Sequence, residues 1–229
     1  MATIPANIQQ VRRRIATACD AARRPVQSVT LVCVGKLHPA TALREAVAAG
    51  ERHFGENYVQ EGLDKIAALA DLRERIEWHL IGPLQSNKTR LVAEHFDWVH
   101  TVDRLKVAER LSAQRPAQLP PLQLLLQVNI SGETSKSGLP VDEVLPVARA
   151  VAALPRLCLR GLMAIPEPAA DLAAQRRPHA ALRELLDHLR REGLTLDTLS
   201  MGMTDDLEAA VLEGATQVRI GTAIFGPRA

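Results

Sequence analysis

Short apolar runs alternate with longer helical patterns along the whole chain, and this alternation restricts the fold more than any other feature. A helix is also expected before the first run, over about 5–24. The eight runs with the length of buried strands are 29–34, 53–56, 77–82, 98–102, 122–130, 157–163, 196–202 and 216–221. With 229 residues, each strand–helix unit takes about 29 residues, close to the length of a βαβ step. The pattern predicts one (β/α)8 TIM-like barrel with an extra N-terminal helix.

A doubly wound open sheet is the competing interpretation. Such a sheet would need a phosphate-binding loop early in the chain, but neither GxGxxG nor GxxxxGK[ST] follows the first strand run. No stretch has the composition of a linker. We therefore expect residues 1–229 to form a single domain.

Charge and composition exclude several classes of protein. The formal net charge of +2 and the 47% hydrophobic content argue against disorder and against a basic nucleic-acid-binding surface. No run of about 18 apolar residues predicts a membrane span. The three cysteines show no CxxC, and the seven histidines show neither HxH nor HExxH, so no metal site is expected. Arg12–Arg14, near the N-terminus, are expected on a solvated helix face and make a signal peptide improbable. We expect a cytoplasmic protein with no nucleic-acid or membrane partner.

Lys36 is the first candidate for chemistry because it directly follows an apolar strand run. Ligands of (β/α)8 barrels bind at the carboxyl ends of the strands. A lysine placed there can lose its proton and form a Schiff base with a carbonyl compound. From position alone, a surface lysine extending out of a loop is the favoured explanation.

The segments 200–202 and 219–222 end the last two strand runs and carry Ser, Gly, Arg and Thr. Loops after strands seven and eight commonly hold phosphate in barrels, through backbone N–H groups and hydroxyls. Ordinary capping by Thr204 would also explain part of this pattern. Together with Lys36, these segments favour a ligand that carries both a carbonyl group and a phosphate.

Several polar side chains near the strand ends have weaker signals. His79 alternates with Trp78 and Leu80, so we expect it on the opposite face of its strand, either as a core residue or at the site. Asn57, Asn129 and the loop 133–138 could supply hydrogen-bonding groups at the rim, although composition alone favours a simple polar turn for the loop.

Long segments of the chain resemble a known family. These segments are VGKLHPA (34–40), HFGENYVQE (53–61), EWHLIGPLQSNK (77–88), VNISGETSKSG (128–138), RGLMAIP (160–166), LSMGMTDDLEAA (199–210) and VRIGTAIFG (218–226). Over nearly its full length the chain resembles the pyridoxal-phosphate homeostasis proteins, the YggS/PROSC-type proteins that bind pyridoxal 5'-phosphate (PLP). The resemblance implies a barrel of the alanine racemase N-terminal-domain kind.

The resemblance also implies a set of cofactor contacts. PLP would be held as a Schiff base on Lys36. The phosphate would be held by Ser200, the backbone near Gly202, Gly221 and Thr222. Arg219 would face the pyridine nitrogen, and Asn57, His79 and Met163 would line the ring. Lys136, in the SKSG segment, is implied as a secondary residue near the cofactor.

Two departures from the family pattern bear on function. The family often has Ser-Lys-Thr-Lys around the cofactor lysine, whereas this chain has Gly35-Lys36-Leu37-His38, so a second amine is replaced by His38. The chain ends soon after Gly226, where we expect no room for a C-terminal β-domain that would supply a racemase tyrosine.

Three functions follow as hypotheses. The first is a non-catalytic protein that buffers PLP or delivers it to apo PLP-dependent enzymes, as a monomer or weak homodimer. The second is a PLP-dependent amino-acid racemase with His79 or Tyr58 as the acid/base. The third is a Schiff-base aldolase of sugar phosphates that uses the same lysine without a cofactor.

Overall fold

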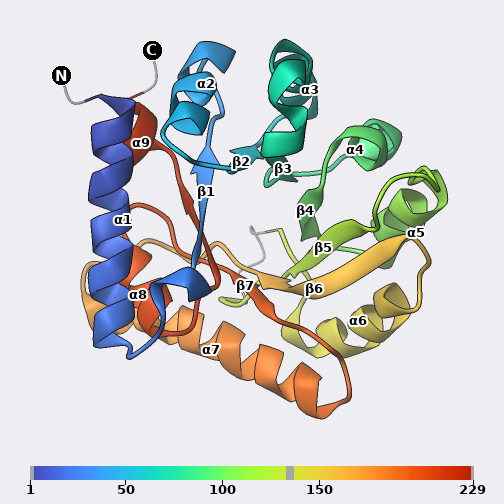
Figure 1. The fold of residues 1–229 in the computed structure, drawn as a ribbon. Coiled ribbons are helices and arrows are strands. Elements are labelled where there is room, and N and C mark those ends of the chain that lie inside the picture. The colour runs from blue at the N-terminus through green and yellow to red at the C-terminus, as the bar shows by residue number, and fades with distance from the viewer. Residues whose placement is uncertain (1–2, 133–136, 228–229) are drawn as a thin grey trace.

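The apolar runs form parallel strands that close into a barrel in chain order, with β8 hydrogen-bonded to β1. The computed structural model describes residues 3–132 and 137–227. The strands are β1 (Thr30–Val34), β2 (His53–Glu56), β3 (Glu77–Leu80), β4 (Trp98–Val102), β5 (Leu122–Gln127), β6 (Leu157–Met163), β7 (Thr198–Ser200) and β8 (Gln217–Ile220). The predicted (β/α)8 barrel is confirmed, and Figure 1 shows the helices around it.

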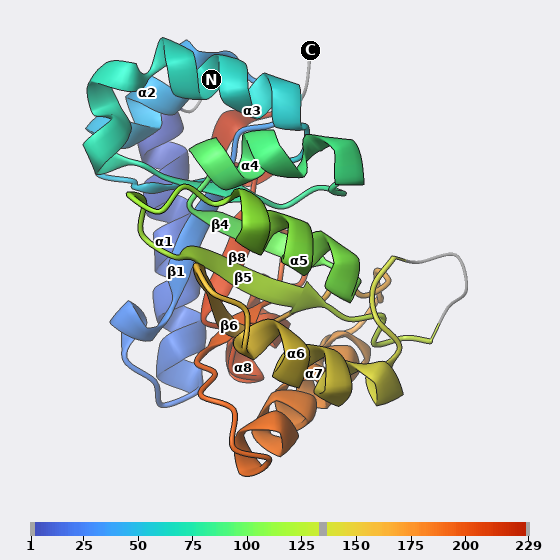
Figure 2. The ribbon, with the colours of Figure 1, turned by 90° about the vertical axis from the view of Figure 1, so that its right-hand side faces the viewer.

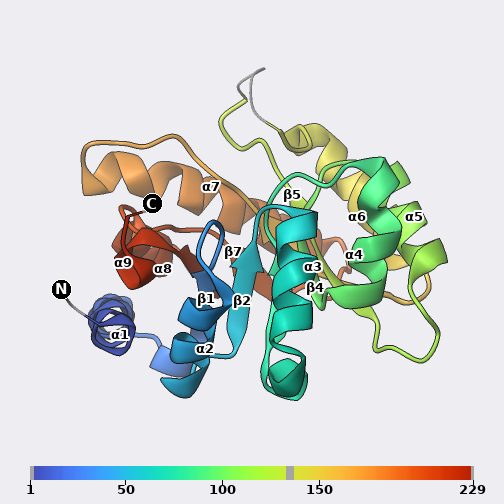
Figure 3. The same cartoon turned by 90° about the horizontal axis from the view of Figure 1, so that it is seen from above.

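The helices surround the strands on their outer side (Figures 2 and 3). They are α1 (Ile4–Ala21), α2 (Ala40–Ala48), α3 (Val59–Ala68), α4 (Thr89–His95), α5 (Leu105–Gln114), α6 (Val144–Ala152), α7 (Leu172–Arg191), α8 (Leu207–Leu212) and α9 (Thr222–Phe225). Helix α3 is followed by the 3-10 helix Ala70–Arg75. The extra helix α1 lies beside α8 and α9 (Figure 1). No helix within the described ranges is long and apolar enough to cross a membrane.

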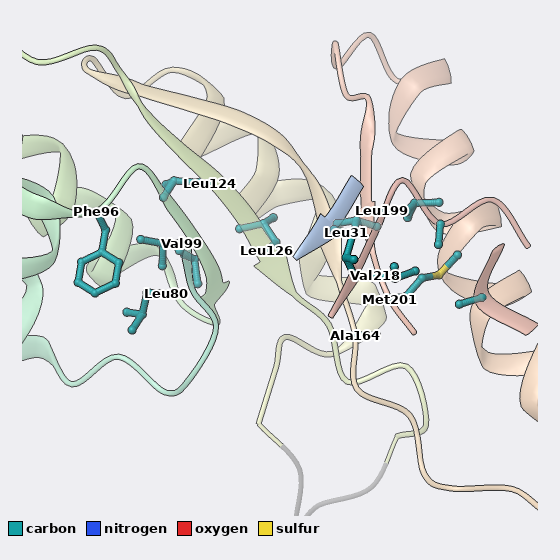
Figure 4. Close-up of a cluster of buried hydrophobic side chains, with 14 of the residues drawn as sticks. Leu31, Leu80, Phe96, Val99, Leu124, Leu126, Ala164, Leu199, Met201 and Val218 are labelled. Carbon is teal, nitrogen blue, oxygen red and sulfur yellow. The ribbon is translucent and has the colours of Figure 1, made fainter. Parts of the chain in front are cut away.

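The main hydrophobic core lies between the strands and the helices. Figure 4 shows part of it, where Leu80, Phe96 and Val99 form one group and Leu199 and Val218 another. These side chains are buried. On the barrel's inner side, Trp98, Leu125 and Met163 form a separate small apolar cluster. The other buried side chains of the inner side include His79, His100, Ser200 and Arg219, and this polar interior leads to the site.

Candidate binding site at the carboxyl end of the barrel

A cavity of about 350 Å³ opens at the carboxyl ends of the strands. This volume falls in the range of about 300–1,000 Å³ that is typical of small-molecule sites. The structure brings predicted site residues from three loops to its wall. They are Lys36 after β1, Asn57 after β2, and Arg219, Gly221 and Thr222 at the end of β8.

A buried lysine, Lys65, and a buried glutamate, Glu56, position the loop that carries Lys36. Lys65, on α3, is 5% exposed. Its Nζ donates to Gly35 O at 2.7 Å, Glu56 Oε1 at 2.8 Å and Glu61 Oε1 at 2.7 Å. The first two bonds tie α3 to the residue before Lys36 and to the last residue of β2, and the third lies within α3.

The residue after Lys36 is held by the same cluster. Leu37 N donates to Glu61 Oε1 at 2.5 Å. Leu37 has φ +63°, in the left-handed region that residues with a Cβ rarely adopt. The backbone on both sides of Lys36 is therefore fixed by hydrogen bonds to Lys65 and Glu61, which limits where the Lys36 side chain can extend.

Glu56 is the carboxyl group near the cavity whose pKa is shifted most from its usual value. Burial raises the pKa of Glu56 from 4.5 to about 7, while the charge and hydrogen bond of Lys65 and the charge of Lys36 oppose the rise. Its Oε2 is buried without a hydrogen-bond partner among the described residues. Glu56 thus changes charge near neutral pH, next to the lysine loop.

Arg219 places a buried positive charge at the cavity wall. Its Nη1 donates to Ser200 Oγ at 2.6 Å and its Nη2 donates to Ala164 O at 3.0 Å. Burial lowers the pKa of Arg219 to about 10, with the charge of Asp206 opposing. The guanidinium therefore remains protonated at neutral pH, and two of its nitrogens are already engaged on the barrel side.

The loops after β7 and β8 form the part of the wall suited to an anion. Gly221 and Thr222 begin α9, and a Cβ at Gly221 would lie 3.2 Å from Val34 O. Gly202 has φ +92° and does not line the cavity, but a Cβ there would lie 2.5 Å from the Ala210 Cβ. Gly202 therefore shapes the loop that presents Thr204. Thr204 lines the cavity, which was not predicted from the sequence.

Helix α1 braces both of these loops. Arg14 donates to Thr204 O at 2.8 Å and to Glu208 Oε1 at 2.7 Å. Asn7 Nδ2 donates to Ile224 O at 2.8 Å, in α9. Arg12 and Arg13 are exposed, as expected of a solvated face, but Arg12 also pairs with the buried Glu51, and Arg14 is half-buried. These ion pairs need partners far away in the sequence, which no local pattern shows.

Three other predicted residues lie in the barrel interior, beneath the cavity, and do not line it. His79, Ser200 and Met163 are each fully buried. His79 Nδ1 and His100 Nε2 are 2.9 Å apart, and His100 Nδ1 and Ser200 Oγ are 2.9 Å apart. Direct contact of these residues with a cofactor stays a prediction. Lys136 lies outside the described residues.

The series His53, His79, His100, Ser200 and Arg219 forms a polar column through the barrel. His53 Nδ1 is 3.2 Å from His79 Nε2 and begins the column at the opposite end. Burial lowers the pKa of His79 and His100 well below 6.5, and neighbouring histidine and arginine charges add to this. Both rings are therefore neutral at pH 7. Sequence reasoning missed His100, although its alternation with Val99 and Thr101 places it on the inner face.

Comparison with known proteins supports the assignment of the fold and the family. Residues 4–229 match the family model described as the alanine racemase N-terminal domain. The fold and the site therefore define a barrel protein of the alanine racemase N-terminal-domain class.

Close relatives narrow the class further. The chain is 62% identical to the pyridoxal phosphate homeostasis protein of Pseudomonas aeruginosa and 54% to that of Escherichia coli, over 100% of this chain and 97% and 98% of theirs. The structure of PipY of Synechococcus elongatus with PLP bound is similar, with TM-score 0.82 and 40% identity over 94% of this chain and all of that one. The chain belongs to the pyridoxal phosphate homeostasis protein family.

Proposed function

We propose that the chain binds PLP in the cavity at the carboxyl end, as one barrel domain over residues 1–229, and buffers or delivers the cofactor. The observation that carries the proposal is the buried Oδ1 of Asn57 at the cavity, which has no hydrogen-bond partner within the described residues. Such an orphaned acceptor suits a polar ligand with a donor group. The phenolic hydroxyl of PLP, or water beside it, is a donor of this kind.

The remaining wall residues fit the other parts of the cofactor. The Lys36 amine would hold the aldehyde carbon, and the Thr222 hydroxyl with the backbone of Gly221 would hold the phosphate. The positive charges of Lys36 and Arg219 favour an anion. When bound, PLP supplies an aldehyde that condenses with primary amines and a ring that withdraws electrons.

The positions of the acid/base candidates, more than Arg219, bear on catalysis of the racemase kind. A guanidinium near the pyridine nitrogen opposes its protonation and weakens the ring as an electron acceptor. Of the two acid/base candidates, Tyr58 is 57% exposed and does not line the cavity, and His79 is enclosed in the column. These positions support the binding function over the racemase alternative.

Covalent trapping tests the binding proposal. We expect purified protein to take up one PLP per chain, which borohydride fixes to Lys36 in a peptide map. Lys36→Ala should take up none, whereas Lys106→Ala, at an exposed lysine of α5, should behave as the wild type. Equal covalent uptake by Lys36→Ala would refute the proposal.

Hydrogen exchange tests the absence of catalysis. The titratable groups His38 and Asp205 line the cavity and are further candidates for an acid or base there. We expect the PLP-loaded protein to exchange the Cα hydrogen of a panel of amino acids no faster than free PLP does. Faster exchange that His38→Gln or Asp205→Asn removes would establish an enzyme.

Delivery, assembly and location remain predictions from the sequence. If the protein delivers PLP, an apo PLP-dependent enzyme should regain activity faster from the loaded protein than from an equal concentration of free PLP. Sedimentation should give a monomer or a weak homodimer, and cell fractionation should place the chain in the cytoplasm.

A further inference from the structure

A second and larger cavity, of about 650 Å³, opens at the amino ends of the strands, at the opposite end of the barrel from the cofactor cavity. The first residues of β2 and β3, His53 and Glu77, line it and are paired directly in register. His79 lies two residues further along β3, so its side chain is on the same face as that of Glu77. Three groups that can bind metal therefore lie close together, with His53 and Glu77 at the opening and His79 buried beneath it.

The distances between these groups match a metal site. His53 Nδ1 is 3.2 Å from His79 Nε2 and 3.6 Å from Glu77 Oε2, and one ligand atom from each residue lies within 4.8 Å of the others. A tetrahedral ion with bonds of about 2.0–2.1 Å holds its ligand atoms about 3.3–3.4 Å apart. The His53 distances lie within a few tenths of an ångström of this value, and the Glu77 and His79 ligand atoms, which lie within 4.8 Å of each other, would have to move closer together to complete the site.

We propose that His53, Glu77 and His79 bind a divalent first-row transition-metal ion, with zinc as the representative of the class. Imidazole nitrogens with one carboxylate oxygen form a donor set that suits zinc and its neighbours rather than calcium or magnesium. Three protein ligands leave a fourth position, which can take a water molecule.

The residues around the three ligands support the proposal because they already orient them. Trp98 Nε1 donates to Glu77 Oε2 at 2.9 Å, and the Trp98 ring is stacked on His79, with centroids 5.4 Å apart and an interplanar angle of 11°. The second nitrogen of His79 is hydrogen-bonded to His100. Metal-binding side chains are typically held in this way by outer partners that fix their orientation.

Cobalt(II) is the probe that tests the site, in the full-length protein with and without PLP. We expect one equivalent to bind and to give the intense visible absorption of tetrahedral cobalt, without sulfur-to-metal charge transfer, and zinc to displace it. Trp98 fluorescence should be quenched in the same titration, because its ring is stacked on a ligand. Absence of binding, a weak octahedral spectrum, or charge transfer from a thiolate would overturn the proposal.

Substitutions locate the ion. Glu77→Gln keeps an acceptor for Trp98 but loses the charge, and His53→Gln removes a second ligand. Each should weaken metal affinity by about 100-fold or more, since loss of an outer partner alone weakens it by about 10- to 100-fold. His188→Gln, at a half-buried histidine of α7, is the matched control and should leave the affinity unchanged. Unchanged affinity in both ligand variants, with thermal unfolding showing that they are folded, would refute the assignment.

Discussion

Replacing Lys65 by Met is expected to destabilise the fold strongly at pH 8 and less at pH 5.5. The Lys65 ammonium is buried and donates three hydrogen bonds, of which one goes to the fully buried Glu56. Met occupies a similar volume but donates none, so Glu56 would be a buried carboxylate without its closest cation. Breaking a buried ion pair by removing one partner destabilises a protein by about 3–5 kcal/mol.

The pH dependence follows from the titration of Glu56. Its pKa is raised from 4.5 to about 7, chiefly by burial. A carboxyl group with a raised pKa binds its proton more tightly in the folded state, so its contribution to stability is present at low pH and is lost as the pH rises from 4.5 through 7. Without Lys65, the pKa of Glu56 should rise further. At pH 5.5 the carboxyl is then protonated, and the loss should fall to about 1–3 kcal/mol, from the unpaired Gly35 and Glu61 acceptors.

Urea unfolding of both proteins at pH 5.5 and 8 measures this difference. Lys106→Met, at an exposed lysine, is the matched control and should change the free energy of unfolding by no more than about 0.5 kcal/mol. The double variant Glu56→Gln/Lys65→Met should be more stable at pH 8 than Lys65→Met, because the amide carries no charge. Equal losses at the two pH values, or a loss at pH 8 below the roughly 1 kcal/mol of an exposed pair, would refute the reasoning.

Three further predictions concern the same end of the barrel. Arg14→Met should weaken PLP affinity about tenfold, the equivalent of one or two lost hydrogen bonds, in an absorbance titration in which Arg13→Met stays unchanged. Gly82→Ala should also weaken PLP binding, because its Cβ would lie 2.0 Å from Asn57 O and must displace that residue; unchanged affinity would contradict this. In the wild type, ionisation of Glu56 should cost stability that Glu56→Gln does not lose. The free energy of unfolding of the wild type, relative to that of Glu56→Gln, should therefore fall by about 3 kcal/mol as the pH rises from 4.5 to above 7. A difference that does not change with pH would contradict the raised pKa of Glu56.

The strands of the barrel were predictable because strands buried on both faces form continuous apolar runs. The ends of the strands were less predictable. The run 196–202 becomes β7 over only Thr198–Ser200, since the apolar residues beyond it, such as Met201, are buried in the loop and not in the sheet. Helix α9 was missed because Thr222–Phe225 is too short for a helical period.

Part of the candidate site was also predictable from the sequence, and part was not. Lys36, Asn57 and Thr222 could be proposed because residues directly after barrel strands share one end of the fold. The Lys65 cluster could not, since a lysine on an amphipathic helix gives no sign that its amine is buried against Glu56. The three groups at the amino end share no metal-binding motif, because one comes from β2 and two from β3, and only the strand register brings them together.

If the proposed metal ion binds, we expect the polar column to couple it to the cofactor cavity. Arg219 can only donate to Ser200 Oγ, so without metal the Ser200 hydroxyl can donate to His100, His100 to His79, and His79 Nε2 to His53. A metal ion on His79 Nε2 replaces that proton and requires the opposite order, in which His79 donates to His100 and His100 donates to Ser200. The Ser200 hydroxyl then no longer donates to His100 and can donate to another acceptor. Ser200 also binds Arg219 at the cofactor cavity, so the ion should change PLP affinity, and PLP should change metal affinity by the same factor. His100→Phe interrupts the column and should abolish this coupling while the protein still binds each ligand. Coupling that persists unchanged in His100→Phe would show that it does not pass through the column.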